Sequence, residues 1–165
     1  MSNVLSIRNR QRNRPVNVPL LRRLLQHLLR DQFGADDFEI GVHLVNATEM
    51  ARLNEKFLRH QGSTDVITFD HSTGTEEPGL RGEIFISIPD AVTQARQFRT
   101  TWPSELARYA IHGLLHLRGY DDLDPARRRA MKREENRFLR SLAARFPLAQ
   151  LGWRSRVPAR RSTHH

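Results

Sequence analysis

The sequence predicts a single domain of the α+β class, in which a mixed sheet of about four strands packs against about five helices. Two observations favour this class. The 165 residues match the usual size of one domain with one hydrophobic core, and strand and helix patterns alternate along most of the chain. The domain is expected over residues 1–151. Residues 152–165 have no periodic apolar face and predict a basic, disordered tail.

The individual elements follow from apolar periodicity, taken in chain order. Residues 4–10 predict an edge strand, and leucines recur at helical spacing over residues 20–29. Alternating apolar residues predict strands at 38–45, 65–69 and 83–88, with a helix at 48–58. Residues 71–82 have the composition of a loop. Pro89, Pro103 and the Asp124–Pro125 pair mark the first turns of three helices that end near residues 99, 118 and 144.

Arginine dominates the charge of the chain. There are 27 basic residues, of which only Lys56 and Lys132 are lysines, against 18 acidic residues, and the net charge is +9. Residues 1–35 contribute +6 and residues 145–165 contribute +5, while residues 36–144 have a net charge of −2. Arginine-rich ends suit an anionic partner such as nucleic acid, but a solvated surface has the same composition.

Composition excludes several classes of protein. The chain has no cysteine, which excludes a disulfide scaffold, a thiolate nucleophile and a cysteine-ligated metal site. No stretch reaches the roughly 18 apolar residues of a membrane span, and the first twenty residues lack the apolar run of a signal peptide. We therefore expect a cytoplasmic protein without a membrane partner, in which histidine and carboxylate hold any metal.

The segment HGLLHLRGYDD, residues 112–122, carries the strongest chemical pattern. His112 and His116 are four residues apart on a predicted helix, so both rings project from one face within reach of a single ion. Gly119 stands where glycine commonly ends a helix in the left-handed conformation, and that turn can bring Asp122 back toward the histidines. Two imidazoles and a carboxylate, with a fourth position open to water, are typical of a catalytic zinc site.

Pairs of histidines at this spacing are common by chance, so their place on the helix matters. They lie nearly opposite the predicted apolar stripe, aligned with Glu105 and Tyr109. With Gly119 and Asp122 at the matching offsets, a metal site is favoured over a solvated face. The spacing also resembles the zinc signature of metalloproteases, but the residue that is the glutamate base in those enzymes is Gly113 here.

The same segment is similar to the H-G-x-L-H-L-x-G-Y-D-H signature of the YbeY family of bacterial endoribonucleases, at every specified position except the last. The resemblance extends to LNEKFLRHQGSTDVITF, residues 53–69, and to Gly82-Glu83-Ile84, and it covers about residues 38–140. It implies a zinc-dependent, single-strand-specific endoribonuclease in ribosomal RNA maturation, with roles in small-subunit 3′ end processing and ribosome quality control. The implied partners are single-stranded RNA, ribosomal RNA, and the ribosome or its small-subunit assembly factors.

The resemblance also implies roles for individual residues. It implies one Zn²⁺ ion held by His112, His116 and residue 122, where family members usually have histidine and this chain has Asp122. Asp121 and Asp124 are the alternative carboxylates. Arg59 matches the family's functionally important arginine, and as a catalytic residue its planar guanidinium would stabilise charge that develops on the phosphate.

Two other kinds of function stay open. One is a metal-dependent hydrolase of another substrate class, such as a peptidase whose base is Glu105 or Glu83. The other is a ribosome-assembly or RNA-binding factor without catalysis, which would use the arginines of residues 20–30 and of the tail. Of the remaining histidines, His43 is expected to be packed or paired, and His71 follows its strand closely enough to approach the site.

Overall fold

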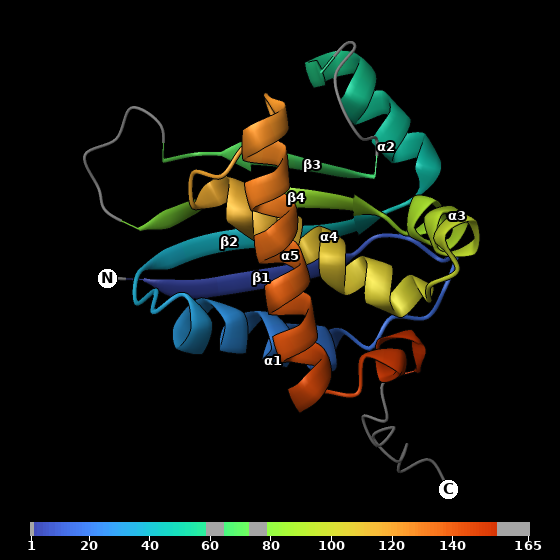
Figure 1. The fold of residues 1–165 in the computed structure, drawn as a ribbon. Helices are drawn as coiled ribbons and strands as arrows, with labels where there is room; N and C mark the ends of the chain where they lie inside the picture. The colour runs from blue at the N-terminus through green and yellow to red at the C-terminus, as the bar shows by residue number, and fades with distance from the viewer. Residues whose placement is uncertain (1, 59–64, 73–78, 155–165) are drawn as a thin grey trace, which may run out of the picture.

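The computed structural model describes residues 2–58, 65–72 and 79–154, whose strands form one mixed sheet in the order β1-β2-β4-β3 (Figure 1). Three strands, β1 (Asn3–Asn9), β2 (Phe38–Val45) and β4 (Leu80–Ser87), are parallel neighbours. The edge strand β3 (Val66–Asp70) runs antiparallel to β4. The predicted α+β class and the predicted edge position of the first strand are confirmed.

Five α-helices lie within these described ranges, as the sequence predicts. They are α1 (Val18–His27), α2 (Ala47–Leu53), α3 (Ile88–Phe98), α4 (Trp102–Leu117) and α5 (Pro125–Arg145). Two π-helical turns, Leu28–Gln32 and Asn54–Leu58, extend α1 and α2, and a short 3-10 helix at Leu148–Gly152 follows α5. A capping side chain precedes each α-helix, and these caps are Asn17, Asn46, Ser87, Thr101 and Asp124.

The largest difference from the prediction is at β4, which begins at Leu80 inside the expected loop. Its first residues pair in register with Phe38 and Glu39 of β2. Residues 71–82 as a whole have the composition of a loop, but at position 82 the glycine allows close packing within a strand. A Cβ at this position would collide with the carbonyl oxygen of Phe69 and lie 2.5 Å from a methyl carbon of Leu117.

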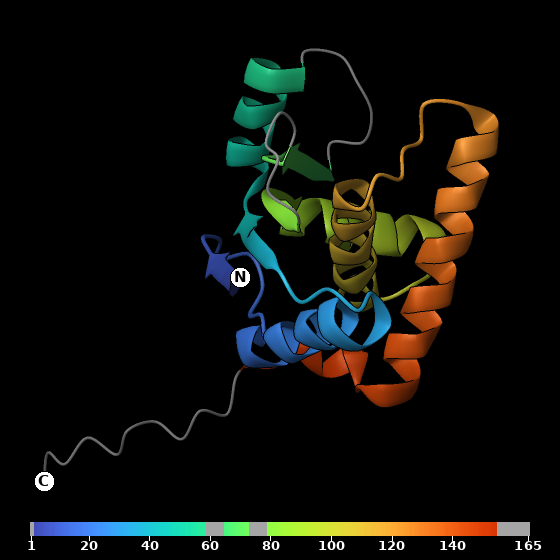
Figure 2. The same cartoon turned by 90° about the vertical axis from the view of Figure 1, so that its left-hand side faces the viewer.

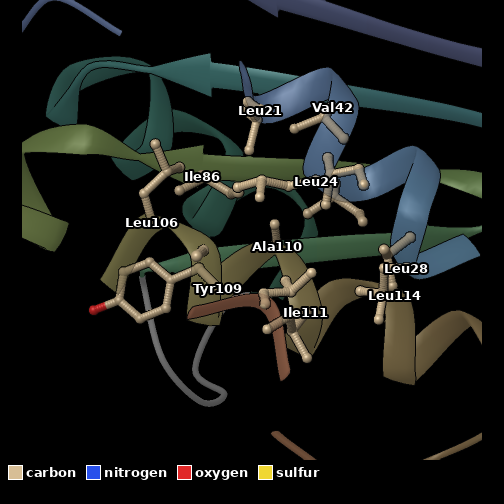
Figure 3. Packing of buried hydrophobic residues seen from close by; sticks show 14 of the residues in the cluster. Leu21, Leu24, Leu28, Val42, Ile86, Leu106, Tyr109, Ala110, Ile111 and Leu114 are labelled. Atoms are coloured by element: carbon tan, nitrogen blue, oxygen red, sulfur yellow. The ribbon is translucent and has the colours of Figure 1, made fainter. Parts of the chain in front are cut away.

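The core lies between one face of the sheet and the two helices α1 and α4. Figure 3 shows Leu24 of α1, and Leu28 of the π-helical turn that extends it, packed toward Val42 of the sheet and toward Ala110 and Leu114 of α4. Helix α5 covers the outer side of α4, so that α4 lies between the sheet and α5 (Figure 2). Helix α2 packs on the opposite face of the sheet around a smaller apolar cluster.

Helix α4 approaches the sheet closely at Gly113. A Cβ there would lie 2.7, 2.8 and 2.9 Å from three side-chain carbons of Ile84 in β4. Such contacts are too short for a packed interior, so glycine is required at this depth. His112 precedes Gly113 by one residue, and His116 follows it by three. The position of both histidines is therefore fixed by the packing of α4 on β4.

The C-terminal region is well packed as far as the short 3-10 helix. Leu151 is fully buried, and its carbonyl oxygen accepts a hydrogen bond from the backbone N–H of Asn17 at 2.8 Å. Gly152 lies against the ring of Trp102. From residue 155 on, the predicted tail lies outside the described residues. In the part of the chain that is described, no helix has the length and apolar character needed to cross a membrane.

Candidate metal centre

Helix α4 places the rings of His112 and His116 against each other. Their Nε2 atoms are 3.0 Å apart, and the ring centroids are separated by 4.6 Å at an interplanar angle of 79°. Both side chains are half-buried. The predicted convergence of the two imidazoles on one point is therefore present in the structure.

Each ring is held by a partner at its other nitrogen. The Nδ1 atom of His112 lies 2.6 Å from a carboxylate oxygen of Glu135 in α5. The Nδ1 atom of His116 lies 3.0 Å from the carbonyl oxygen of Tyr120. A carbonyl oxygen and an ionised carboxylate only accept hydrogen bonds, so both Nδ1 atoms carry the hydrogen in the neutral rings. Both Nε2 atoms then present lone pairs to the same point.

This arrangement fits a zinc ion. Two lone pairs facing each other at 3.0 Å repel unless a cation lies between them. Nitrogen ligands at about 2.0–2.1 Å from a tetrahedral Zn²⁺ are separated by about 3.3 Å, close to the observed spacing. A carboxylate or carbonyl that fixes the far nitrogen is also the usual support for a zinc-bound histidine.

Asp122 completes a group of three possible ligands. Within the described ranges, one ligand atom from each of His112, His116 and Asp122 lies within 4.8 Å of the others. The predicted turn accounts for this, because Gly119 has φ +99° and the backbone N–H of Tyr120 donates to the carbonyl of Leu115. Asp122 is the exposed member of this group, and the two histidines are half-buried.

The two alternative carboxylates are engaged elsewhere. Asp124 caps α5 by accepting a hydrogen bond from the backbone N–H of Arg127 at 2.8 Å. Asp121 accepts from the backbone N–H of Leu123 and forms an ion pair with Arg127 at 3.2 Å. Of the three acidic residues in this turn, Asp122 is therefore the one suited to bind a metal.

The charges around the site favour a neutral ring at His116 and an ionised carboxylate at Glu135. Burial and the neighbouring ring of His112 lower the pKa of His116, against the opposing effect of Asp122. Burial alone would raise the pKa of Glu135, but the hydrogen bond from His112 and the positive charges of Lys132 and Arg108 outweigh it and lower that pKa. A neutral His116 ring is the form that binds zinc, and an ionised Glu135 is the form that accepts a hydrogen bond from Nδ1 of His112.

The site opens into a cleft of about 670 Å³ between α3, α4, α5 and the residues that lead into β3. The sequence predicts a polar face here, and the structure shows that this face is covered rather than solvated, since Glu105 and Tyr109 are only 7% and 8% exposed. The Tyr109 hydroxyl points away from the apolar cluster (Figure 3) and donates to Asp65 at 3.3 Å. Burial and the charge of Asp65 raise the pKa of Tyr109, which keeps this hydroxyl protonated.

The other candidate residues lie apart from this group or outside the described residues. Arg59 and His60 lie outside them. His71 does not approach the metal group. Its Nε2 lies 3.0 Å from Glu83, and His43 contacts the second oxygen of the same carboxylate at 2.9 Å. His43 also stacks on Phe85, as expected for a packed and paired residue.

Glu135, which contacts Nδ1 of His112, is a residue of the candidate site that the sequence interpretation missed. It lies in an apolar stripe of the last helix, with Met131, Phe138 and Leu142 at intervals of four, three and four residues. A glutamate in such a stripe predicts a buried carboxylate that requires a partner, and this signal was available. The identity of the partner, His112, was not, because it lies 23 residues away on another helix.

A family model, curated relatives and a solved structure are similar to this chain over most of its length. Residues 6–143 match the family model described as Endoribonuclease YbeY. A curated Endoribonuclease YbeY from Salinibacter ruber is 32% identical over 84% of this chain and 91% of its own length, and one from Chlorobium phaeovibrioides is 40% identical over 71% and 77%. The solution structure of a Thermotoga maritima protein, TM1509, aligns with a TM-score of 0.59 and 26% identity over 86% of this chain and 90% of that one.

Proposed function

Because the chain belongs to the Endoribonuclease YbeY family, we propose that it is a zinc-dependent endoribonuclease that cleaves single-stranded RNA. We propose ribosomal RNA maturation as its role, including small-subunit 3′ end processing and ribosome quality control. Its partners would be ribosomal RNA and the ribosome or its assembly factors, and its place the cytoplasm. The observation that carries the proposal is the pair of Nε2 atoms 3.0 Å apart, each ring fixed at Nδ1, beside the carboxylate of Asp122.

We propose the following roles for the individual residues. His112, His116 and Asp122 would hold the ion, which when bound supplies Lewis acidity to water or to a phosphate oxygen. Glu135 and the carbonyl of Tyr120 orient the two rings and keep their Nε2 atoms unprotonated. Arg59, by its place in the family motif, would stabilise negative charge on the phosphate during cleavage.

The peptidase alternative names Glu105 or Glu83 as its base, and neither lies within reach of this centre. Ile84 faces Gly113 of α4, so its neighbour Glu83 points to the opposite face of the sheet. Glu105 lines the cleft but precedes His112 by seven residues, about 10 Å along the helix axis. A general base acts from hydrogen-bond distance or through one water molecule, which neither glutamate achieves at this centre.

The direct test is cleavage of a labelled single-stranded RNA by zinc-reconstituted protein prepared without a polyhistidine tag. We expect cleavage of the single strand, little cleavage of the matching duplex, and none of a peptide substrate. His116→Ala should abolish activity, whereas His27→Ala, which alters a histidine paired with Asp31 on α1, should not. A product ending in a 2′,3′-cyclic phosphate would identify the 2′-hydroxyl as the nucleophile. Cleavage that survives His116→Ala would contradict the proposal and favour a contaminant or a non-catalytic RNA-binding role.

A further inference from the structure

The wall of the cleft formed by α5 carries three exposed cations. Arg128, Arg129 and Lys132 line the cleft together with His112 and Asp122. They lie within about 100° of one another around the helix, so they present one cationic face. This face adjoins two of the three proposed metal ligands.

These cations are available to an anionic ligand. Among the described residues none of the three forms an ion pair, and Arg128 contacts only the carbonyl oxygen of Asp122, at 3.5 Å. Two other arginines of the helix are neutralised, since Arg127 pairs with acidic residues of the preceding turn and Arg137 pairs with a glutamate of α5. Unpaired guanidinium and ammonium groups beside a phosphodiester-cleaving centre are suited to the phosphates of the same strand.

Three of the four acidic residues that line the cleft, Asp65, Glu105 and Glu135, are buried, and the fourth, Asp122, is one of the proposed metal ligands. Glu105 and Glu135 are only 7% and 6% exposed and lie on the floor of the cleft. Glu105 accepts a hydrogen bond from the Thr100 hydroxyl at 2.7 Å, and Glu135 accepts one from His112. The buried carboxylates therefore have partners inside the cleft, and Asp122 is the one exposed acidic residue of its lining, while the three cations face the solvent from which a strand would arrive.

The opposite wall presents an aromatic ring. Phe98, the last residue of α3, lines the cleft and is 63% exposed, which is unusual for a side chain of this size. The helix ends directly after it at Arg99, whose left-handed backbone (φ 55°) turns the chain away. Gln94, one turn earlier on α3, lines the same wall and offers an amide to a base edge. An exposed aromatic ring opposite a row of cations is the usual composition of a surface that binds single-stranded nucleic acid.

We propose that a single strand of RNA binds across this cleft, with phosphates on Arg128, Arg129 and Lys132 and one unpaired base stacked on Phe98. The inference rests on the proposed ribonuclease function of the metal group, of which His112 and Asp122 line this cleft. It assigns the preference for single strands to Phe98, because a base inside a duplex is paired and stacked and does not reach the ring. A cleft of this size also suits a nucleotide rather than a double helix.

The cations are tested with the triple variant Arg128→Gln, Arg129→Gln and Lys132→Gln. A matched control replaces Arg133, Arg140 and Arg145, three exposed arginines of the same helix that do not line the cleft. Binding of a labelled twelve-nucleotide single strand is measured against salt concentration in the His116→Ala background, so that cleavage does not intervene. Each lost phosphate contact lowers the slope of log affinity against log salt concentration by about 0.7. The slope for the cleft variant should therefore be smaller by about 2, and its affinity at 0.1 M salt should be up to about a hundredfold weaker.

The aromatic contact is tested at Phe98 itself. Phe98→Leu keeps an apolar side chain without a ring face, and it should weaken single-strand binding by about fivefold to a hundredfold while leaving the salt slope unchanged. Phe98→Trp retains a ring and should restore the affinity. Binding of a duplex should change little in either variant. Wild-type affinity in Phe98→Leu would overturn the stacking assignment.

The outcomes separate this inference from the proposed function. Two results would overturn the assignment of the cleft as the RNA site, even if the unmodified protein cleaves RNA. One is an equal loss of RNA affinity in the cleft and control triple variants, and the other is an unchanged salt slope in the cleft variant. If the unmodified protein shows no ribonuclease activity, the proposed function fails, and the same binding series still decides whether the cleft holds the strand. When the cleft substitutions are made in protein that retains His116, the zinc content of each variant should equal that of the wild type.

Discussion

Replacing Glu135 by glutamine tests how the metal centre is organised. The carboxylate of Glu135 is 2.6 Å from Nδ1 of His112, and its side chain is only 8% exposed, so this is a buried, charge-assisted hydrogen bond. Bonds of this kind contribute about 1.5–3 kcal/mol, and loss of a carboxylate that supports a zinc-bound histidine typically weakens metal affinity tenfold to a hundredfold. We therefore expect the zinc dissociation constant of Glu135→Gln to rise by that factor, equivalent to about 1.4–2.7 kcal/mol.

The assay is a competition titration of zinc-free protein with a chromophoric chelator, and the adjacent residue supplies the control. Glu134 pairs with Arg137 at 2.6 Å and does not line the cleft, so Glu134→Gln removes the same charge from the same helix turn. It should leave zinc affinity within about twofold of the wild type, since exposed ion pairs contribute little. Equal zinc affinity in wild type and Glu135→Gln, or an equal loss in both variants, would refute the role given to Glu135.

Three further outcomes follow from the structure. Gly113→Ala should lower the free energy of unfolding in urea by about 1–2 kcal/mol, because overpacking against Ile84 outweighs the gain in helix propensity; no loss would contradict the close approach of α4. The hydrogen bond from His71, and then that from His43, lower the pKa of Glu83 despite partial desolvation. The ionised carboxylate therefore stabilises the fold at pH values above its ordinary pKa of 4.5, and this stabilisation is lost as the pH falls through the lowered pKa. Glu83→Gln should therefore cost less than about 1 kcal/mol at pH 6 and nothing in strong acid, and a cost that grows toward acid would contradict this. Deleting residues 155–165, which include three arginines, should lower the salt slope of RNA binding by up to about 2 and leave zinc bound, whereas loss of zinc would contradict the separation of tail and site.

Local sequence patterns predicted most of the fold. Leucines at helical spacing define α1, and Asp124 before Pro125 marks the start of α5 through a cap that the structure contains. The histidine pair and the turn at Gly119 were also readable, because both depend on residues within one helix and the turn that ends it. These features share one property, which is that their partners lie close together in sequence.

Features that depend on distant contacts could not be predicted in the same way. Gly113 was interpreted as a position without a catalytic side chain, and its packing against Ile84 appears only when α4 crosses β4. The pairing of His71 with Glu83 depends on the register of β3 with β4. In each case the contact joins two elements whose relative position the sequence pattern leaves open.

The net charge of the middle of the chain did not reveal the basic residues of α5. Residues 36–144 have a net charge of −2, yet α5 alone has eight basic and two acidic residues. The ends of the chain were therefore predicted to provide the attraction for RNA. The structure adds a cationic surface on α5 beside His112 and Asp122, formed by residues that a sum over the middle of the chain does not distinguish.

The central claim is that Asp122 takes the place of a third histidine in a zinc site. It is tested most directly by the zinc content of untagged protein, measured by mass spectrometry, for the wild type and for Asp122→Ala, Asp122→His and Asp121→Ala. The account predicts about one zinc per chain in the wild type, in Asp122→His and in Asp121→Ala, whose carboxylate pairs with Arg127. It predicts a marked loss of zinc in Asp122→Ala. Undiminished zinc in Asp122→Ala, or a wild-type protein that binds none, would contradict it.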